Sequence, residues 1–204
     1  KWPAAVAYVR ANHLNRIVFN PPQAKLGLVS AGKAYLDLRQ ALQDIGLDNT
    51  ACAQLGIRLL KVGCIWPMDV QGLRDFSAGL EEIFVVEEKL PLLESGLKDA
   101  LYALSGPRPR IFGKTDEALL PKAGELNPAI LAQALAKWLN SRLSESRQAA
   151  VKTRLTILKA QQLSLPATII GERAPWFCSG CPHNTSTNIP GGSRAISGTG
   201  CHYM

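Results

Sequence analysis

Between residues 25 and 113, short apolar segments alternate with segments that carry apolar residues at helical spacing. Four of the apolar segments have the length of buried strands: residues 26–30, 57–62, 82–87 and 110–112. The segment that follows the first of them repeats apolar residues every three or four positions, at Tyr35, Leu38, Leu42 and Ile45. Strands separated by helices need crossover connections, which make neighbouring strands parallel. We therefore predict an α/β fold with a mainly parallel sheet and flanking helices.

The organisation changes near residue 115. Residues 105–126 are rich in Gly and Pro and are typical of a linker. Asn127 and Pro128 then have the chemistry of a helix start, and a second helix is expected over about residues 145–163. Beyond Pro166 one short apolar run, residues 167–170, is followed by loop-like sequence. The predicted division is a lead-in (1–24), the α/β domain (25–115), and a linker with helices and the incomplete start of another domain (116–204).

One near match to a phosphate-binding loop lies at Gly27–Ala34. The pattern requires Ser or Thr after the Lys to bind Mg²⁺, and this chain has Ala34 there. The first glycine also falls inside a predicted strand, whereas the motif needs it in the loop after the strand. We therefore interpret Ala31 and Gly32 as a tight turn between a strand and a helix.

Composition excludes several classes of protein. The chain is 47% hydrophobic, which argues against intrinsic disorder, and has no apolar run of the ~18 residues that cross a bilayer. Its net charge is +7, with the excess strongest between Arg142 and Arg173. That stretch has no aromatic residue, although nucleic-acid binders usually interleave aromatics with denser basic clusters. We expect a solvated face or a contact with an acidic region of the parent protein, and neither nucleic acid nor membrane as a partner.

The five cysteines divide into two groups. Cys52 and Cys64 lie beside apolar residues, where buried free thiols are common. Cys178, Cys181 and Cys201 lie close together in the sequence, in the C-terminal segment 178–204. An odd count, no secretion signal and a Cys-x-x-Cys pair favour a reducing, cytoplasmic location and a metal or redox site over a disulfide framework.

The residue types around the C-terminal cysteines allow two metals. An iron–sulfur cluster normally needs four protein ligands, and three cysteines are present, so a fourth would have to follow Met204. Zinc is an equal alternative on spacing alone, because His183 or His202 could complete a Cys₃His set. A metal-free redox dithiol comes third, since such a pair normally opens a helix and Pro182 with its Gly-rich surroundings offers little of one.

The C-terminal motifs resemble a known family. Phe177-Cys178-Ser179-Gly180-Cys181-Pro182-His183-Asn184 and Gly198-Thr199-Gly200-Cys201-His202-Tyr203 are similar to segments of the single-chain, fused bacterial indolepyruvate ferredoxin oxidoreductases. These enzymes are thiamine-diphosphate-dependent 2-oxoacid:ferredoxin oxidoreductases. The segments 25–33, 66–68 and 85–89 also resemble the transketolase C-terminal-like domain of this family.

The resemblance implies specific roles. Cys178, Cys181 and Cys201 would be ligands of a [4Fe–4S] cluster, and Gly198 and Gly200 would form the turn that presents Cys201. The fourth ligand and the segment that binds Mg²⁺ and diphosphate would lie past Met204. The α/β domain would be largely structural, so that Glu87 and Glu88 need no catalytic role.

The two histidines of these motifs are candidates for contacting substrate or diphosphate. His183 and His202 flank the expected ligands, but we favour hydrogen bonding of both to the backbone of a loop. Trp176 and Phe177 would shield the cluster from solvent.

The resemblance also implies an activity for a longer parent protein. The parent would oxidatively decarboxylate indolepyruvate or a related 2-oxoacid, form the acyl-CoA and reduce ferredoxin. Its other domains, ferredoxin, CoA and the 2-oxoacid would be its partners, and the full-length protein is expected to be a homo-oligomer. The 204-residue chain alone is expected to be inactive, as an internal fragment. The alternative is a non-enzymatic α/β interaction module with a zinc-stabilised Cys/His tail.

Overall fold

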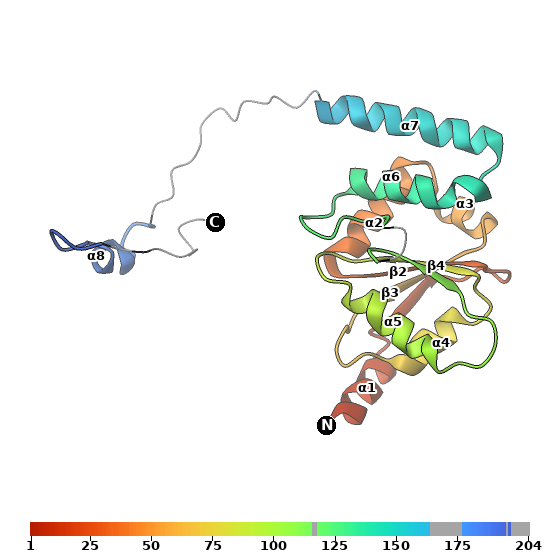
Figure 1. Cartoon of the computed structure of the whole chain (residues 1–204), viewed down its shortest axis with the longest axis horizontal. Helices are drawn as coiled ribbons and strands as arrows, with labels where there is room; N and C mark the ends of the chain where they lie inside the picture. The colour runs from red at the N-terminus through yellow and green to blue at the C-terminus, as the bar shows by residue number, and fades with distance from the viewer. Residues whose placement is uncertain (116–117, 164–176, 195, 197–204) are drawn as a thin grey trace. The chain divides into compact units, whose positions relative to one another are not determined.

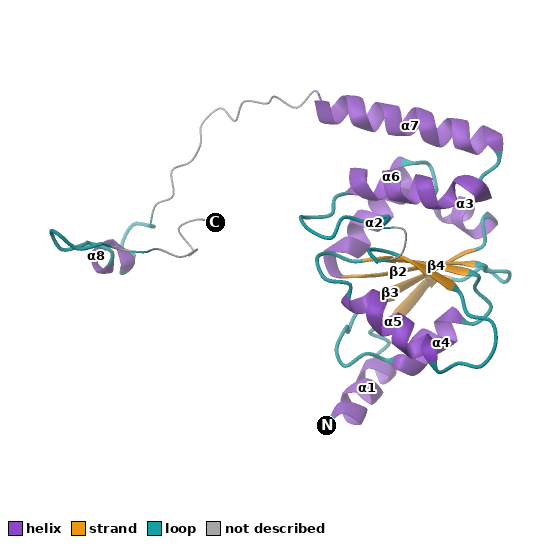
Figure 2. Cartoon of the chain, in the orientation of Figure 1, coloured by secondary structure: helices purple, strands orange, loops and turns teal. Residues whose placement is uncertain are grey.

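The computed structural model describes residues 1–115, 118–163, 177–194 and 196 (Figure 1). The chain forms two compact units, Lys1–Ser164 and Leu165–Met204. The first unit contains a five-stranded sheet with helices on both faces, which confirms the predicted α/β class (Figure 2). The second unit contains the cysteine pair.

The sheet has the strand order β1-β3-β2-β4-β5, and its four parallel strands lie where the sequence predicts them. The strands are β1 (Arg16–Phe19), β2 (Leu26–Ala31), β3 (Ile57–Val62), β4 (Glu82–Val86) and β5 (Arg110–Phe112). Central β2 pairs with β3 in the register Leu28 to Leu59 and with β4 in the register Leu28 to Phe84. Both faces of β2 are therefore buried, as expected for a parallel strand between two helical layers.

The helices connect the strands and cover the sheet. They are α1 (Trp2–Ala11), α2 (Gly32–Asp44), α3 (Asn49–Gln54), α4 (Val70–Ser77), α5 (Leu92–Tyr102), α6 (Pro128–Leu139), η1 (Asn140–Arg142), α7 (Glu145–Leu163) and α8 (His183–Ser186). Side-chain caps define three helix starts: the carboxylates of Asp48 and Asp69 and the amide oxygen of Asn127 each accept a backbone N–H of the first turn. The predicted helix start at Asn127 and Pro128 is confirmed.

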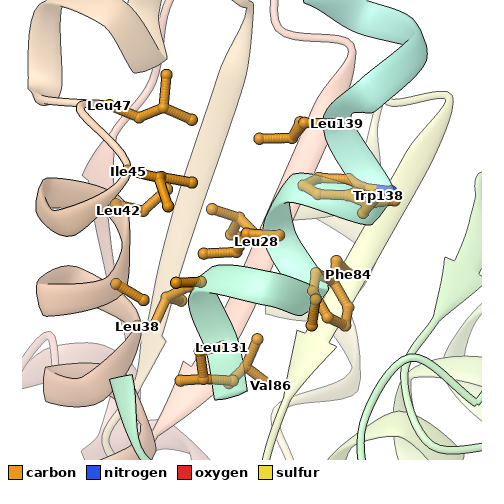
Figure 3. Close-up of a cluster of buried hydrophobic side chains, with 14 of the residues drawn as sticks. Leu28, Leu38, Leu42, Ile45, Leu47, Phe84, Val86, Leu131, Trp138 and Leu139 are labelled. Atoms are coloured by element: carbon orange, nitrogen blue, oxygen red, sulfur yellow. The ribbon is translucent and has the colours of Figure 1, made fainter. Parts of the chain in front are cut away.

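One hydrophobic core lies between the sheet and helices α2 and α6 (Figure 3). Leu38 and Leu42 of α2 face Leu131 and Trp138 of α6, and Leu28 and Phe84 of the sheet pack in the same cluster. The Trp138 ring lies 5.4 Å from that of Phe84 and 6.5 Å from that of Phe112, measured between centroids. Helix α6 therefore packs directly on the sheet, although the sequence places it beyond the linker.

The opposite face of the sheet forms a second core with α4 and α5. Its sheet residues alternate with those of the first core, so that Val29 and Val85 point to this face while Leu28 and Phe84 point to the other. Phe76 of α4 and Leu97 of α5 are fully buried against them. The period-two pattern of the strands thus fills both helical layers.

The N-terminal segment is part of the first unit. Strand β1 pairs antiparallel with β3, with Arg16 opposite Lys61, and forms the edge of the sheet. Arg10 of α1 forms an ion pair with the carboxylate of Asp69 at the start of α4. The hydrogen bonds from Arg10 hold the pKa of Asp69 below its ordinary value despite burial, and the backbone N–H of Gly72 adds to this effect.

The compact unit extends across both predicted domain boundaries. Residues before 25 supply β1, and residues after 115 supply α6 and the buried side chains of Leu120 and Leu126. The division at residues 24/25 and 115/116 stays a prediction about domains of the parent protein. The segment 118–127 is mostly exposed and is anchored to the unit by the buried side chains of Leu120 and Leu126.

Replacing Leu38 with Ala should test the core under α2 and α6. The Leu38 side chain is 0% exposed, so its truncation should lower the free energy of unfolding by about 2–5 kcal/mol. Leu36→Ala, on the same helix at 64% exposure, is the matched control and should stay within about 0.5 kcal/mol of the parent. Urea denaturation followed by circular dichroism measures both, and equal losses would contradict this packing.

Candidate functional site

Open α/β sheets usually bind ligands where the strand order reverses, outside the carboxyl ends of the strands. In this sheet the reversal lies between β2 and β4, because β3 and β4 pair with opposite edges of β2. The segments that follow these two strands begin with Gly32 and Glu87. This position is therefore the first candidate for a site in the first unit.

The chain itself occupies the reversal point. Lys33 donates a hydrogen bond from Nζ to the carbonyl oxygen of Leu126 over 2.8 Å. The Glu88 Oε1 atom accepts the N–H of Leu126 over 3.2 Å and lies 3.5 Å from Lys33 Nζ. Both polar groups of one buried residue are thus held by side chains from the ends of β2 and β4. We name these three residues the Leu126 clamp.

A second set of polar contacts fixes the ends of β4 and β5. The Glu87 carboxylate accepts the N–H groups of Leu93 and Glu94 over 2.7 and 2.8 Å, which caps α5. The buried Glu94 carboxylate accepts the N–H of Lys114 over 2.7 Å and Nζ of Lys98 over 2.9 Å, and it also contacts the Thr115 hydroxyl. Glu87 and Glu88 therefore have structural partners, in line with the interpretation that they need no catalytic role.

Burial and hydrogen bonding shift the pKa values of Glu87 and Glu94 in opposite directions. Burial raises the pKa of Glu87 and outweighs the two backbone hydrogen bonds that lower it. Burial acts in the same direction on Glu94, but hydrogen bonds from Thr115, Lys114 and Lys98 together hold the pKa of Glu94 below its ordinary value. Burial lowers the pKa of Lys114, whose Nζ atom donates to the carbonyl oxygen of Pro121. These shifts have structural causes and define no reactive pair.

The structure also shows the conformation of Gly27–Ala34, the near match to a phosphate-binding loop. Gly27 lies within β2, and Gly32 begins α2 with a φ of 55°. Ala31 and Gly32 thus form the tight turn that the sequence predicts. Lys33 contacts Asp37 over 2.7 Å in addition to the Leu126 clamp, so its charge is directed to the protein itself.

The second unit contains the cysteine pair in a closed turn. The N–H of Cys181 donates to the carbonyl oxygen of Cys178 over 3.0 Å, and the side chain of Asn184 donates to the same oxygen over 3.2 Å. Gly180 has a φ of 77°, which only glycine adopts without strain, so the turn depends on it. Cys178 is exposed and Cys181 is half-buried, so both thiols are accessible.

His183 lies against this turn. Its Nδ1 atom is 3.5 Å from the Sγ atom of Cys181. Its ring stacks on Phe177, with 5.4 Å between centroids and 29° between the planes. The side chain of His183 thus contacts a thiol and an aromatic ring, whereas the sequence favours a hydrogen bond to the backbone.

The structure covers part of the predicted site. Cys178 and Cys181 share one turn and His183 contacts Cys181, whereas Gly198, Gly200, Cys201 and His202 lie outside the described residues. Among residues 1–115, 118–163, 177–194 and 196, no group of three or more His, Cys, Asp or Glu side chains is arranged to hold a metal ion. Two thiols in a closed turn fit half of the donor set of an iron–sulfur cluster or a zinc ion.

Two features near the cysteines differ from the sequence analysis or were missed by it. One helical turn, α8, begins at His183, with Pro182 as its N-cap, because proline is tolerated at the start of a helix. The second feature is the Asn184 side chain, which ties the turn to Cys178. Asn often bonds to nearby backbone, so its place directly after the motif was the available signal.

Within the described part of the chain, no helix is both long and apolar enough to cross a bilayer.

Comparison with known families gives one match to most of the chain. Residues 16–164 match the family described as indolepyruvate oxidoreductase domain. This range covers the whole sheet, α6 and α7.

Curated relatives have the same name in several archaea. The indolepyruvate oxidoreductase subunit IorA of Methanothermobacter marburgensis is 28% identical over 84% of this chain and 24% of its own length. That of Thermococcus kodakarensis is 28% identical over 94% of this chain and 28% of its own length. The chain therefore spans about a quarter of the length of these relatives.

Solved structures show weaker similarity. A 2-oxoglutarate:ferredoxin oxidoreductase from Magnetococcus marinus aligns with 60% of this chain and 19% of its own, at a TM-score of 0.40 and 16% identity. A split-gene transketolase aligns with 70% of this chain and 41% of its own, at a TM-score of 0.37 and 16% identity. The fold assignment rests on the sheet order and register described above.

Replacing Glu94 with Gln should show how much the negative charge of Glu94 contributes to stability through its contacts after β5. The carboxylate is 1% exposed and accepts hydrogen bonds from three residues, so Glu94→Gln should lower the free energy of unfolding at pH 7 by about 1.5–3 kcal/mol. Because the pKa of Glu94 is lowered by folding, this contribution is present above the ordinary glutamate pKa of about 4.3 and is lost as the pH falls through the folded pKa.

The measurement is urea denaturation of parent and variant between pH 7 and pH 3. The difference between them should shrink toward the acidic end. Glu125→Gln, at an exposed position, is the control and should leave stability unchanged at every pH. A difference for Glu94→Gln that is independent of pH would contradict an ionised, hydrogen-bonded carboxylate.

Proposed function

This chain belongs to the indolepyruvate oxidoreductase domain family, and from that premise we propose that it is part of an oxidoreductase acting on indolepyruvate or a related 2-oxoacid. The full-length enzyme oxidatively decarboxylates its substrate, forms the acyl-CoA and CO₂, and reduces ferredoxin. The observation that carries this proposal is the family match over residues 16–164. The cysteine turn that follows this range supplies ligands of the type that the reaction needs.

The cofactors of the full-length enzyme are thiamine diphosphate with Mg²⁺ and a [4Fe–4S] cluster. When bound, thiamine diphosphate would supply an electron sink for the decarboxylation of a 2-oxoacid. A one-electron acceptor such as ferredoxin needs an intermediate carrier, and the cluster has that role. Cys178, Cys181 and Cys201 are its proposed ligands in this chain, with Gly198 and Gly200 as the turn before Cys201.

The first unit has a structural role in this proposal. The Leu126 clamp lies at the ends of β2 and β4, and polar side chains at the ends of β4 and β5 are bonded to the protein itself. We assign it to the transketolase C-terminal-like domain, which packs against the remaining domains of the parent chain. The full-length protein is a cytoplasmic homo-oligomer, and the 204-residue chain alone, at about a quarter of the relatives' length, is inactive.

The test of the proposed activity uses the full-length enzyme purified without oxygen. Mixing the enzyme with indolepyruvate, CoA and ferredoxin should reduce the ferredoxin. Omitting indolepyruvate or CoA should abolish this reduction. Other 2-oxoacids assayed in the same way establish the preferred substrate class. Lack of ferredoxin reduction with every 2-oxoacid, in a preparation with full iron and thiamine diphosphate, would contradict the proposal.

Replacing Cys181 with Ser should separate the cluster from a zinc site. In the full-length enzyme, Cys181→Ser should lower bound iron and reduce ferredoxin reduction by at least tenfold, because a ligand thiolate is lost. Cys64→Ser is the matched control, since Cys64 is half-buried in the first unit and its Sγ atom donates a hydrogen bond to the carbonyl oxygen of Trp66. It should keep iron and activity.

Metal analysis of the same preparations distinguishes the alternative function. Stoichiometric zinc without iron would contradict the cluster and favour a non-enzymatic interaction module with a zinc-stabilised tail. Full activity of Cys181→Ser would contradict the assignment of this residue as a ligand.

A further inference from the structure

In the contact between His183 and Cys181, chemistry determines which group donates the hydrogen bond. A thiolate only accepts hydrogen bonds, so the Nδ1 atom at 3.5 Å from Sγ must carry the proton when Cys181 is ionised. The thiolate is the form of cysteine that binds metal. His183 is therefore placed to donate an N–H···S hydrogen bond to a metal-binding sulfur.

The ring of His183 is fixed by contacts other than the thiol. It stacks on Phe177, the residue directly before the cysteine motif. His183 is also the first residue of α8, and its carbonyl oxygen accepts the N–H of Thr187 over 3.0 Å. The backbone and the ring of His183 are thus both held in place, so the fold of the turn determines where the Nδ1 atom lies.

The distance of 3.5 Å between His183 Nδ1 and Cys181 Sγ is also compatible with His183 as a metal ligand. Two ligands of one tetrahedral zinc, with Zn–S of about 2.3 Å and Zn–N of about 2.0 Å, are also separated by about 3.5 Å. A ligand role would bring Cys178, Cys181 and His183 together around one point. A [4Fe–4S] cluster, by contrast, takes four Cys thiolates as its ligands. In the proposed cluster His183 is therefore a neighbour of a ligand.

We propose that His183 is a positioning residue that donates a hydrogen bond from Nδ1 to the Sγ atom of Cys181 and thereby raises the reduction potential of the cluster. This inference rests on the proposed function, in which Cys181 is a cluster ligand. Reduction adds one electron to the cluster and places more negative charge on its sulfurs. A hydrogen bond to a sulfur stabilises that charge, and such bonds are among the factors that set cluster potentials.

Two substitutions separate the hydrogen bond from the ring stacking. His183→Phe keeps an aromatic ring opposite Phe177 and removes the donor. His183→Asn removes the stacking and keeps an N–H donor close to the position of Nδ1, because the Asn amide branches at the same carbon as the imidazole. Both are made in the full-length enzyme, and the cluster signal is identified as the one that Cys181→Ser removes.

The measurement is a redox titration of the cluster followed by electron paramagnetic resonance. His183→Phe should shift the midpoint potential to a more negative value, with a change of about tenfold in the reduction equilibrium constant, equivalent to about 59 mV for one electron. His183→Asn should stay close to the parent, and both variants should keep full iron. If His183→Phe does not accumulate, His183→Leu, whose side chain has no N–H donor, replaces it with the same expectation.

The outcomes distinguish this inference from the proposed function. A parent enzyme without iron contradicts the proposed cluster itself. An unchanged potential in His183→Phe, with iron retained, overturns the role of His183 and leaves the cluster in place. Loss of iron in both His183→Phe and His183→Asn shows that His183 is a ligand, which also overturns the inference.

Discussion

The first unit depends on covering both faces of one parallel sheet. The central strand β2 has neighbours on both edges and apolar side chains on both faces, so neither face can meet water. Helices α4 and α5 cover one face, and α2 with α6 covers the other. Because α6 comes from beyond the Gly- and Pro-rich segment, that segment has to return the chain across the sheet. The path of residues 118–127 follows from this requirement, and so does the burial of Leu126.

Most of the first unit could be predicted from the sequence, because its strands are short apolar segments and its helices have apolar faces. The bounds of β3 and β5 agree with the expected ranges, and α6 begins at the expected cap. Strand β1 was missed because Arg16 and Ile17 are exposed at the sheet edge, where the apolar alternation is weak. The packing of α6 on the sheet was missed because a Gly- and Pro-rich segment indicates a linker whether or not its few apolar residues are buried.

The candidate site was predicted to a different extent. The spacing of Cys178 and Cys181 with Gly180 between them indicates a tight turn, and the structure has this turn. The contacts of His183 could not be read from the sequence, because a histidine two residues after a cysteine can point to the backbone, the thiol or the solvent. The stacking on Phe177 decides between these, and it depends on how the chain enters the turn.

The Leu126 clamp has a consequence for how the first unit responds to small molecules. A diffusing ligand that sought the sheet edge would have to displace a peptide group that is part of the same chain. A tethered group is present at an effective concentration of about millimolar or more, whatever the composition of the surroundings. At this edge the Leu126 peptide group therefore already holds the hydrogen bonds that Lys33 and Glu88 could otherwise offer to a ligand.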